Sequence, residues 1–191
     1  MTFATIEHAL EQLRSGRPVL VLDDEDRENE GDAILAAELA SPQWVGWMVR
    51  HTSGYLCAPM EDTRADRLGL PLMWSANTDP LRTRYTVSVD VSTSTTGISS
   101  VERAATTRAL ADPRTTSADL IRPGHVLPLR ARDGGVLTRR GHTEAAVDLT
   151  RLAGLQAVGL IGEIVHDDGT CARTPDAVSY THLTLPTTPH V

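Results

Sequence analysis

Short apolar runs of strand length alternate with amphipathic segments that begin at helix-capping residues, and this alternation most constrains the fold. An unbroken apolar run of four to eight residues is typical of a buried strand, whereas apolar residues at three- and four-residue intervals are typical of a helix. Strands are predicted close to residues 19–22, 34–37, 55–60, 85–90 and 158–165. The chain is therefore expected to form a sheet with helices packed beside it.

Four segments have the helical pattern. Ser41 is an N-cap before a proline at the first helical position, and Ser99 and Glu102 have the spacing of a capping box. Thr143 can cap a further helix that ends near Gly154. The helices are predicted close to residues 3–15, 42–50, 100–111 and 144–153.

The connections complete the prediction of fold class. Residues 125–130 are predicted to be a loop leading into extended chain, and Asp168 followed by Gly169 signals a hairpin. Strands and helices alternate irregularly, which disfavours a purely parallel array. The expected fold is α+β, a single domain in which a mixed β-sheet is covered by helices in a layered α/β/α-like architecture.

One domain accounts for most of the chain. The 191 residues are enough for one substantial core, and no repeat or interdomain linker divides them. Residues 1–176 are therefore predicted to form that domain. Residues 177–191 are rich in threonine and proline without an amphipathic period, and are expected to be a disordered or non-native tail.

Charge and cysteine content exclude several classes of function. The net charge of −7, with an isoelectric point near 5.4, has the wrong sign for binding nucleic acid or an acidic membrane surface. No apolar run approaches the ~20 residues of a membrane span, and no secretory signal is visible. Cys57 and Cys171 support neither a zinc module nor a disulfide framework. A cytoplasmic protein with reduced thiols is expected, with no nucleic-acid or membrane partner.

An acidic stretch follows the first predicted strand. Residues 23–32 hold seven carboxylates in ten positions, and such crowding is unfavourable unless cations or solvent compensate. The stretch is either a solvated loop or a site for a hard divalent metal, which prefers oxygen ligands. Since the bulk charge also repels an anionic substrate, arginines or bound cations would have to reverse the local field.

Two segments are suited to a phosphate group. Arg139 and a second arginine precede His142 and Thr143 at the start of a predicted helix, where guanidiniums and free amides can bind an anion. The turn at residues 93–97 offers hydroxyls and amides for the same purpose. Both segments also have plainer interpretations, as a capped helix with exposed arginines and as an ordinary polar loop.

Two further residues are candidates for proton transfer. His125 follows a Pro-Gly turn, and histidine is the side chain that most readily exchanges protons near neutral pH. Glu163 lies inside an apolar run, where an unpaired carboxylate is costly. The alternatives are a solvent-exposed turn histidine and a glutamate on the solvent side of the sheet.

The motifs, in order, resemble those of the 3,4-dihydroxy-2-butanone 4-phosphate synthase family of riboflavin biosynthesis. They are D-D-E-D-R-E-N-E-G-D, T-T-G-I-S, R-P-G-H-V, R-R-G-H-T-E-A-A-V-D-L and a later G-E-I. The match in order and spacing covers residues 1 to about 176. The resemblance implies a carbon–carbon lyase that converts D-ribulose 5-phosphate to formate and L-3,4-dihydroxybutan-2-one 4-phosphate. It also implies a homodimer that uses Mg²⁺ or Mn²⁺ at active sites near the subunit interface.

The resemblance also implies roles for individual residues. The metal ligands would be Glu28 and His142. The catalytic residues would be His125, Glu163, Asp32 and Cys57. The substrate-binding residues would be Arg27, Glu28, Asp32, Thr95, Thr96, Arg139, Thr143 and Glu163.

Two other functions remain open from the residues alone. One is another metal-dependent sugar-phosphate isomerase or aldolase, and the other is a non-catalytic module that binds phosphate or metal. Release of formate would separate the first alternative from the synthase, because an isomerase retains all the substrate carbons. The chain stops before any GTP cyclohydrolase II domain of the kind that some relatives carry, so a monofunctional protein is expected.

Overall fold

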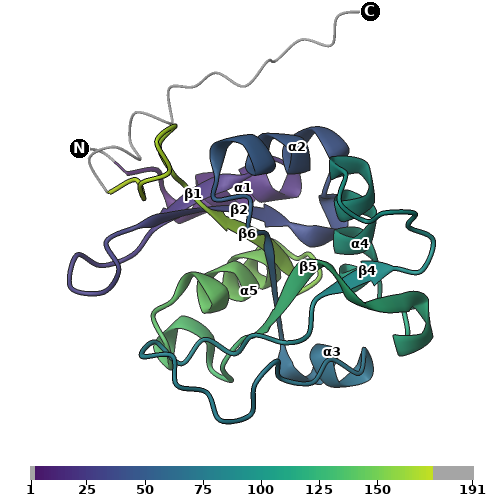
Figure 1. Ribbon diagram of the computed structural model, residues 1–191. Coiled ribbons are helices and arrows are strands. Elements are labelled where there is room, and N and C mark those ends of the chain that lie inside the picture. Colours follow the sequence, from purple (N-terminus) through teal and green to yellow (C-terminus); the bar gives the residue numbers. More distant parts are fainter. Residues whose placement is uncertain (1–2, 174–191) are drawn as a thin grey trace, which may run out of the picture.

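A six-stranded mixed sheet forms the centre of the computed structural model, which describes residues 3–173 (Figure 1). The strand order is β1-β2-β6-β3-β5-β4. Strands β3 and β5 are parallel, and the other neighbouring pairs are antiparallel. The strands are β1 (Val19–Leu22), β2 (Gly31–Ala36), β3 (Cys57–Met60), β4 (Val89–Val91), β5 (Leu120–Arg130) and β6 (Gly159–Glu163). The prediction of a mixed sheet is confirmed.

Five α-helices accompany the sheet within the described residues. They are α1 (Ile6–Arg14), α2 (Pro42–His51), α3 (Asp62–Arg67), α4 (Ser100–Ala111) and α5 (His142–Leu152). Two caps predicted from the sequence are present: the Ser41 hydroxyl accepts from the amide of Trp44, and the Ser99 hydroxyl accepts from the amide of Glu102. Short 3-10 turns occupy residues 37–39, 117–119 and 135–137.

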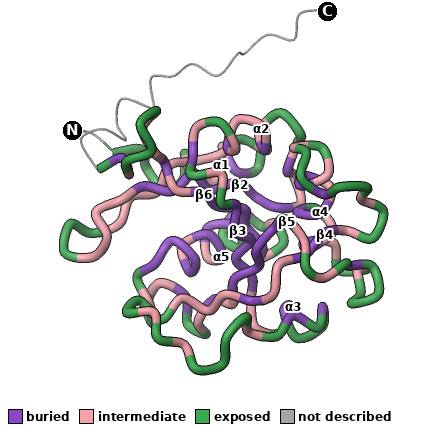
Figure 2. Tube along the Cα trace, in the orientation of Figure 1, coloured by how far each residue is buried: buried purple, intermediate pink, exposed green. Residues whose placement is uncertain are grey.

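The helices cover both faces of the sheet. Ile34 of β2 packs with Leu13 of α1 and Ala146 of α5, whereas the neighbouring Ala33 and Leu35 pack with residues of α2 and α4 on the opposite face. This separation follows from the alternation of side chains along a strand. Figure 2 shows that the buried segments are concentrated in the strands at the centre. The layered α/β/α prediction is confirmed.

Several predicted boundaries are wrong. Residues 125–130 are the second half of the long strand β5 and not a loop, because their backbone groups pair with β3 and β4. Thr143 does not cap α5; Gly141 is the N-cap, and Thr143 lies within the first turn. Residues 85–90 form a shorter strand, with only isolated bridges from Tyr85 to Leu129 and from Thr86 to Leu72 before β4 begins. Helix α3 was not predicted.

The hairpin prediction near Asp168 is confirmed. The amide of His166 donates to the carbonyl of Thr170 over 2.8 Å, and Val165 forms a bridge with Cys171. This hairpin places Cys171 beside the end of β6. The predicted tail at residues 177–191 lies outside the described residues. Among the described helices, none is long and apolar enough to cross a membrane.

Candidate metal and substrate site

A cavity of about 120 Å³ lies on the α5 face of the sheet, where β1 ends, β2 begins and β6 ends. Most of the residues predicted for the site line it. They are Arg27, Glu28, Asp32, Cys57, Arg139, His142, Thr143 and Glu163. Glu30, Ser53, Tyr55, Thr83 and Tyr85 complete most of the polar wall.

Two carboxylates face each other at the base of this cavity. Asp32 of β2 and Glu163 of β6 are direct partners in the antiparallel register. Partners on adjacent strands point to the same face, and two like charges there are unfavourable. Burial, followed by the charge of Glu163, raises the pKa of Asp32 well above its usual value. A proton or a cation is therefore favoured at this position.

The acidic loop between β1 and β2 folds around Asp23. The carboxylate of Asp23 accepts from the backbone amides of Glu28 and Glu30 at 3.1 and 2.8 Å. Arg27 donates to Asp23 over 2.7 Å and is also bonded to Glu28. The loop is thus an ordered turn that directs the Glu28 carboxylate toward the cavity. The plainer prediction of a solvated loop does not describe the part from Asp23 to Glu30 that these bonds hold together.

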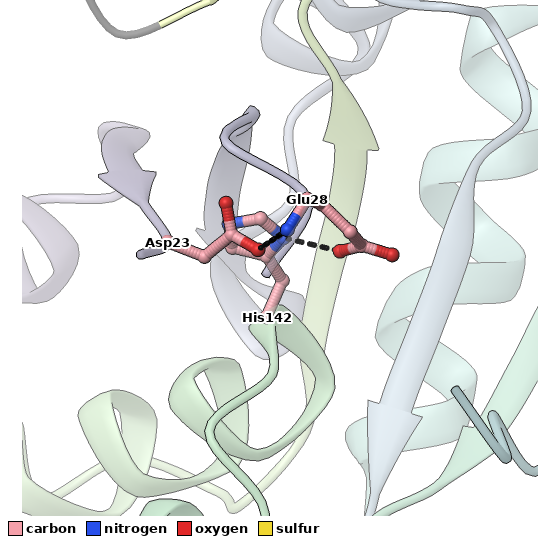
Figure 3. A group of neighbouring side chains, drawn as sticks. All are labelled: Asp23, Glu28 and His142. Atoms are coloured by element: carbon pink, nitrogen blue, oxygen red, sulfur yellow. Dashed lines mark hydrogen bonds and ion pairs between the residues drawn. The ribbon is translucent and has the colours of Figure 1, made fainter. Parts of the chain in front are cut away.

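His142 brings the start of α5 to the acidic loop. Its Nδ1 lies 3.9 Å from Oε2 of Glu28 and 3.5 Å from Oδ1 of Asp32. Figure 3 shows Asp23, Glu28 and His142 close together, from the residue that follows β1, from the loop and from the start of α5. Ligand atoms of the three residues all lie within 4.8 Å of one another.

The protonation of His142 suits it to metal binding. The residue is 8% exposed, and burial lowers its pKa to about 4, so the imidazole is neutral near pH 7. Its Nε2 is buried with no hydrogen-bond partner among the described residues. Neutral imidazole with carboxylate oxygens is a donor set for divalent metals such as Mg²⁺ and Mn²⁺, which favour oxygen ligands and keep several waters. The residues present fit such an ion.

Glu30 and Glu163 form a second close group with Cys171. One ligand atom from each residue lies within 4.8 Å of the other two. A hydrogen bond with Glu163 raises the pKa of Glu30 to about 6. One oxygen of Glu163 is buried with no hydrogen-bond partner among the described residues. Glu163 therefore faces the cavity rather than bulk solvent and can hold or transfer a proton.

The entrance of α5 collects positive charge. Arg139 donates to Glu144 over 2.7 Å and to the Thr83 hydroxyl over 3.1 Å, which fixes its guanidinium against the cavity wall. A side chain on Gly141 would begin 2.2 Å from Nη1 of Arg139 and 3.1 Å from Nη2 of Arg27. Two guanidiniums therefore approach the helix N-terminus, an arrangement that favours an anion such as phosphate.

Cys57 lies on the cavity floor with its thiol protonated. It is paired in the sheet with Leu127 and Ile161, and burial raises the pKa of the thiol to about 12. Since the thiolate is the nucleophilic form, Cys57 is a poor nucleophile in this setting. Its position allows contact with substrate.

Three predicted site residues do not line the cavity: His125, Thr95 and Thr96. His125 is four residues before the lining residue Leu129 on β5, a separation of ~13 Å along a strand. The carboxylate of Glu102 accepts from the amides of Thr95 and Gly97 at 2.6 and 3.1 Å. In a single chain, these amides are occupied by Glu102 and not open to phosphate.

Some residues of the two close groups of possible metal ligands had no assigned role in the sequence prediction. Asp23 and Glu30 belong to the acidic stretch, so the charge density indicated them without distinguishing them from their neighbours. Cys171 gave no signal, because a lone cysteine far from the other residues in sequence has no recognisable spacing. Its place in the group follows from the hairpin after β6.

The fold and the site together define a class: an α+β protein with a carboxylate–imidazole site for a divalent cation beside an arginine-lined helix entrance. The sequence profile of the 3,4-dihydroxy-2-butanone 4-phosphate synthase family matches residues 7–185. The chain belongs to this family.

Relatives and solved structures agree with that membership. The chain is 61% identical over 176 residues to the riboflavin biosynthesis protein RibBA of Salinispora arenicola, and 57% identical to that of Nocardia farcinica over 177 residues. These matches cover 92% and 91% of this chain. They cover only 42% and 43% of the two relatives, so the chain spans less than half of their length.

Two solved structures have the same fold over nearly the whole chain. One is a 3,4-dihydroxy-2-butanone 4-phosphate synthase in complex with two magnesium ions, which is 44% identical to this chain with a TM-score of 0.90. The match covers 94% of this chain and 89% of the synthase. The other is the Candida albicans synthase, which is 48% identical with a TM-score of 0.87, and the match covers 94% of this chain and 90% of that one.

Proposed function

We propose that this chain converts D-ribulose 5-phosphate to L-3,4-dihydroxybutan-2-one 4-phosphate and formate in riboflavin biosynthesis. The convergence of Glu28 and His142, which lie 3.9 Å apart although distant in sequence, carries the proposal. The five-carbon substrate divides into a four-carbon phosphate and a one-carbon acid, and atoms balance without an oxidant. Family membership and the arginine-lined helix entrance support a sugar phosphate as substrate.

The proposed cofactor is Mg²⁺, with Mn²⁺ as an alternative. Glu28 and His142 would hold the ion, and the Asp23 carboxylate lies within the same group. When bound, a divalent cation polarises a substrate carbonyl and offsets the negative charge that develops as a neighbouring proton leaves. The solved relative with two magnesium ions supports a divalent metal.

Residues around the cavity would orient the sugar and move its protons. Arg139, Thr143 and the first amides of α5 would bind the phosphate, whose binding energy can position the reacting carbons. Arg27 and Asp32 would contact the sugar hydroxyls. Glu163 would accept or return a proton, since its buried oxygen has no hydrogen-bond partner among the described residues.

A second copy of the chain would complete the site. His125 and the turn containing Thr95 and Thr96 do not line the cavity of their own chain. A homodimer with active sites near its interface would let these residues of one copy act in the cavity of the other. The exposed apolar side chains of Ile98 and Val101, 53% and 60% exposed beside this turn, support a buried interface there.

Formate release tests the proposal directly. Purified protein with ribulose 5-phosphate and Mg²⁺ should release one formate per substrate, and a chelator should stop the release. Glu163→Gln should bind Mg²⁺ normally yet turn over far more slowly. Retention of all five carbons in the product would favour an isomerase instead, and binding of Mg²⁺ and phosphate without any product would favour a non-catalytic module.

A further inference from the structure

A second cavity lies beside the segment that connects α3 to β4. It measures about 450 Å³, and sites for small molecules typically measure about 300–1,000 Å³. Three arginines line it, Arg82, Arg84 and Arg132, and Leu72 and Ala76 contribute apolar surface. The cavity is therefore large enough for a small molecule and combines positive charge with an apolar wall.

This second cavity is separate from the metal and substrate site. Extended backbone directs alternate side chains in opposite directions, so Thr83 lines the first cavity while Arg82 and Arg84 line the second. From the first side, Arg139 donates to the carbonyl of Leu81 over 3.2 Å and to the Thr83 hydroxyl over 3.1 Å. One segment is thus a wall of both cavities, and none of the described residues lines both.

The positive charge of the second cavity is only partly neutralised. None of the described residues that line it is acidic. Asp62 pairs with Arg84 over 2.6 Å, but Arg82 and Arg132 form no ion pair with any described residue. The Nη2 of Arg132 instead donates weakly, over 3.5 Å, to the backbone carbonyl of Arg82. Two guanidiniums therefore lie together without a carboxylate, and a bound anion would relieve their repulsion.

Arg82 is held in place by hydrogen bonds within its loop. Its φ of 55° lies in the left-handed region, which is uncommon for a residue other than glycine. The Asn77 side chain donates to the carbonyl of Thr83 over 2.8 Å, and the Asp79 carboxylate accepts from the amides of Leu81 and Thr83 at 3.3 and 2.7 Å. The Arg82 guanidinium donates to the carbonyl of Asn77. A guanidinium fixed in advance loses less entropy when it binds a ligand.

We propose that the second cavity is a binding site for a small organic phosphate. Arg82 and Arg132 would bind the phosphate oxygens through the paired N–H donors of their guanidiniums, and Leu72 and Ala76 would contact the apolar part of the ligand. A phosphate monoester suits two unpaired cations, because it carries close to two negative charges near pH 7. No described lining residue belongs to a group of possible metal ligands, so the arginines alone recognise the phosphate.

Calorimetry with adenosine 5′-monophosphate tests the site in protein kept free of metal by a chelator, and adenosine serves as the probe without phosphate. Wild-type protein should bind the monophosphate and not adenosine. The double variant Arg82→Gln/Arg132→Gln should lose about tenfold or more in affinity for the monophosphate, because hydrogen bonds to a charged group are lost. Arg82→Gln alone changes an exposed side chain and should already weaken binding by about threefold or more, so the result does not depend on how the double variant folds.

Two control variants decide where the phosphate binds. Arg114→Gln removes an exposed arginine that pairs with Asp112 in its own turn, and Arg27→Gln removes an arginine of the first cavity. Both should bind the monophosphate within about threefold of wild type. Loss of binding in Arg27→Gln, with normal binding by the double variant, would place the phosphate in the first cavity and overturn the proposal. Equal losses in Arg114→Gln and the double variant would also overturn it, as would wild-type protein that binds no monophosphate at millimolar concentration.

Discussion

Opposed carboxylates give the site its electrostatic character at the residue scale. Asp32 and Glu163 are cross-strand partners, and Glu28 and Glu30 approach them from the loop. Arg27 neutralises part of this charge through Asp23 and Glu28, but Asp32 remains buried with a raised pKa. A divalent cation would relieve the remaining repulsion, which links the folded loop to metal binding.

His142 should titrate far below an ordinary histidine in metal-free protein. Burial lowers its pKa from 6.5 to about 4, so the folded state binds fewer protons than the unfolded state between these values. Its contribution to stability is therefore present above pH 6.5 and is lost as pH falls toward 4. A histidine NMR titration checks this, with the exposed His8 as internal comparison. A midpoint near 6.5 for His142 would contradict the described burial.

Removing the Glu28 carboxylate should weaken metal binding selectively. Glu28→Gln keeps the shape of the side chain but loses the charged ligand, so affinity for Mg²⁺ should fall about tenfold or more, as measured by calorimetry. Glu25→Gln is the matched control, because Glu25 lies exposed in the same loop and belongs to neither metal-type group. An equal loss of affinity in both variants would mean that loop charge alone attracts the ion.

At the scale of elements, local chemistry explains what the sequence could predict. Ser41 and Ser99 begin α2 and α4 through hydrogen bonds to amides only three residues away, so their caps are visible in the sequence. The strand at residues 125–130 was missed because a Pro-Gly pair before it is typical of a turn. Its extended form depends on pairing with β3 and β4, which lie far away in sequence. Non-local pairing of this kind has no local signal.

Packing between β6 and α5 should be sensitive to one methyl group. A Cβ on Gly159 would lie 2.9 Å from Cβ of Ala146, so Gly159→Ala should push α5 away from the sheet. The free energy of unfolding should fall by about 1–3 kcal/mol. Because α5 also carries His142, affinity for Mg²⁺ should fall as well. Chemical denaturation and calorimetry measure the two effects.

Gly46→Ala provides the contrasting variant. Gly46 lies in α2, and a Cβ there would meet Ser100 at an ordinary 3.6 Å. Alanine favours a helix over glycine by about 1 kcal/mol, so this variant should be as stable as wild type or more stable, with unchanged metal affinity. If Gly159→Ala were equally well tolerated, the close approach of β6 and α5 would not constrain the site.

At the scale of the whole molecule, the site depends on distant segments meeting at one edge of the sheet. The residue types at the site could be predicted from motifs, and the resemblance to a family assigned their roles. The register that opposes Asp32 and Glu163, and the distance between Glu28 and His142, are consequences of the tertiary fold. No spacing in the sequence encodes either one.

A dimer that shares its sites should show complementation between inactive variants. His125→Ala and Glu28→Gln each remove one residue of the proposed site, and His125 does not line the cavity of its own chain. Mixed dimers formed by co-expression would contain one intact site, which should restore about a quarter of wild-type formate release if subunits pair at random. A mixture as inactive as its parents would place both residues in the site of one chain.

Electron spin-echo spectroscopy of Mn²⁺-loaded protein tests the metal site most directly, because it detects nitrogen nuclei bound to the ion. The geometry of Glu28 and His142 predicts coupling to one histidine nitrogen, retained in His125→Gln and abolished in His142→Ala. Mn²⁺ bound without nitrogen coupling, or coupling that survives in His142→Ala, would contradict the convergence of the acidic loop and α5 on a single cation.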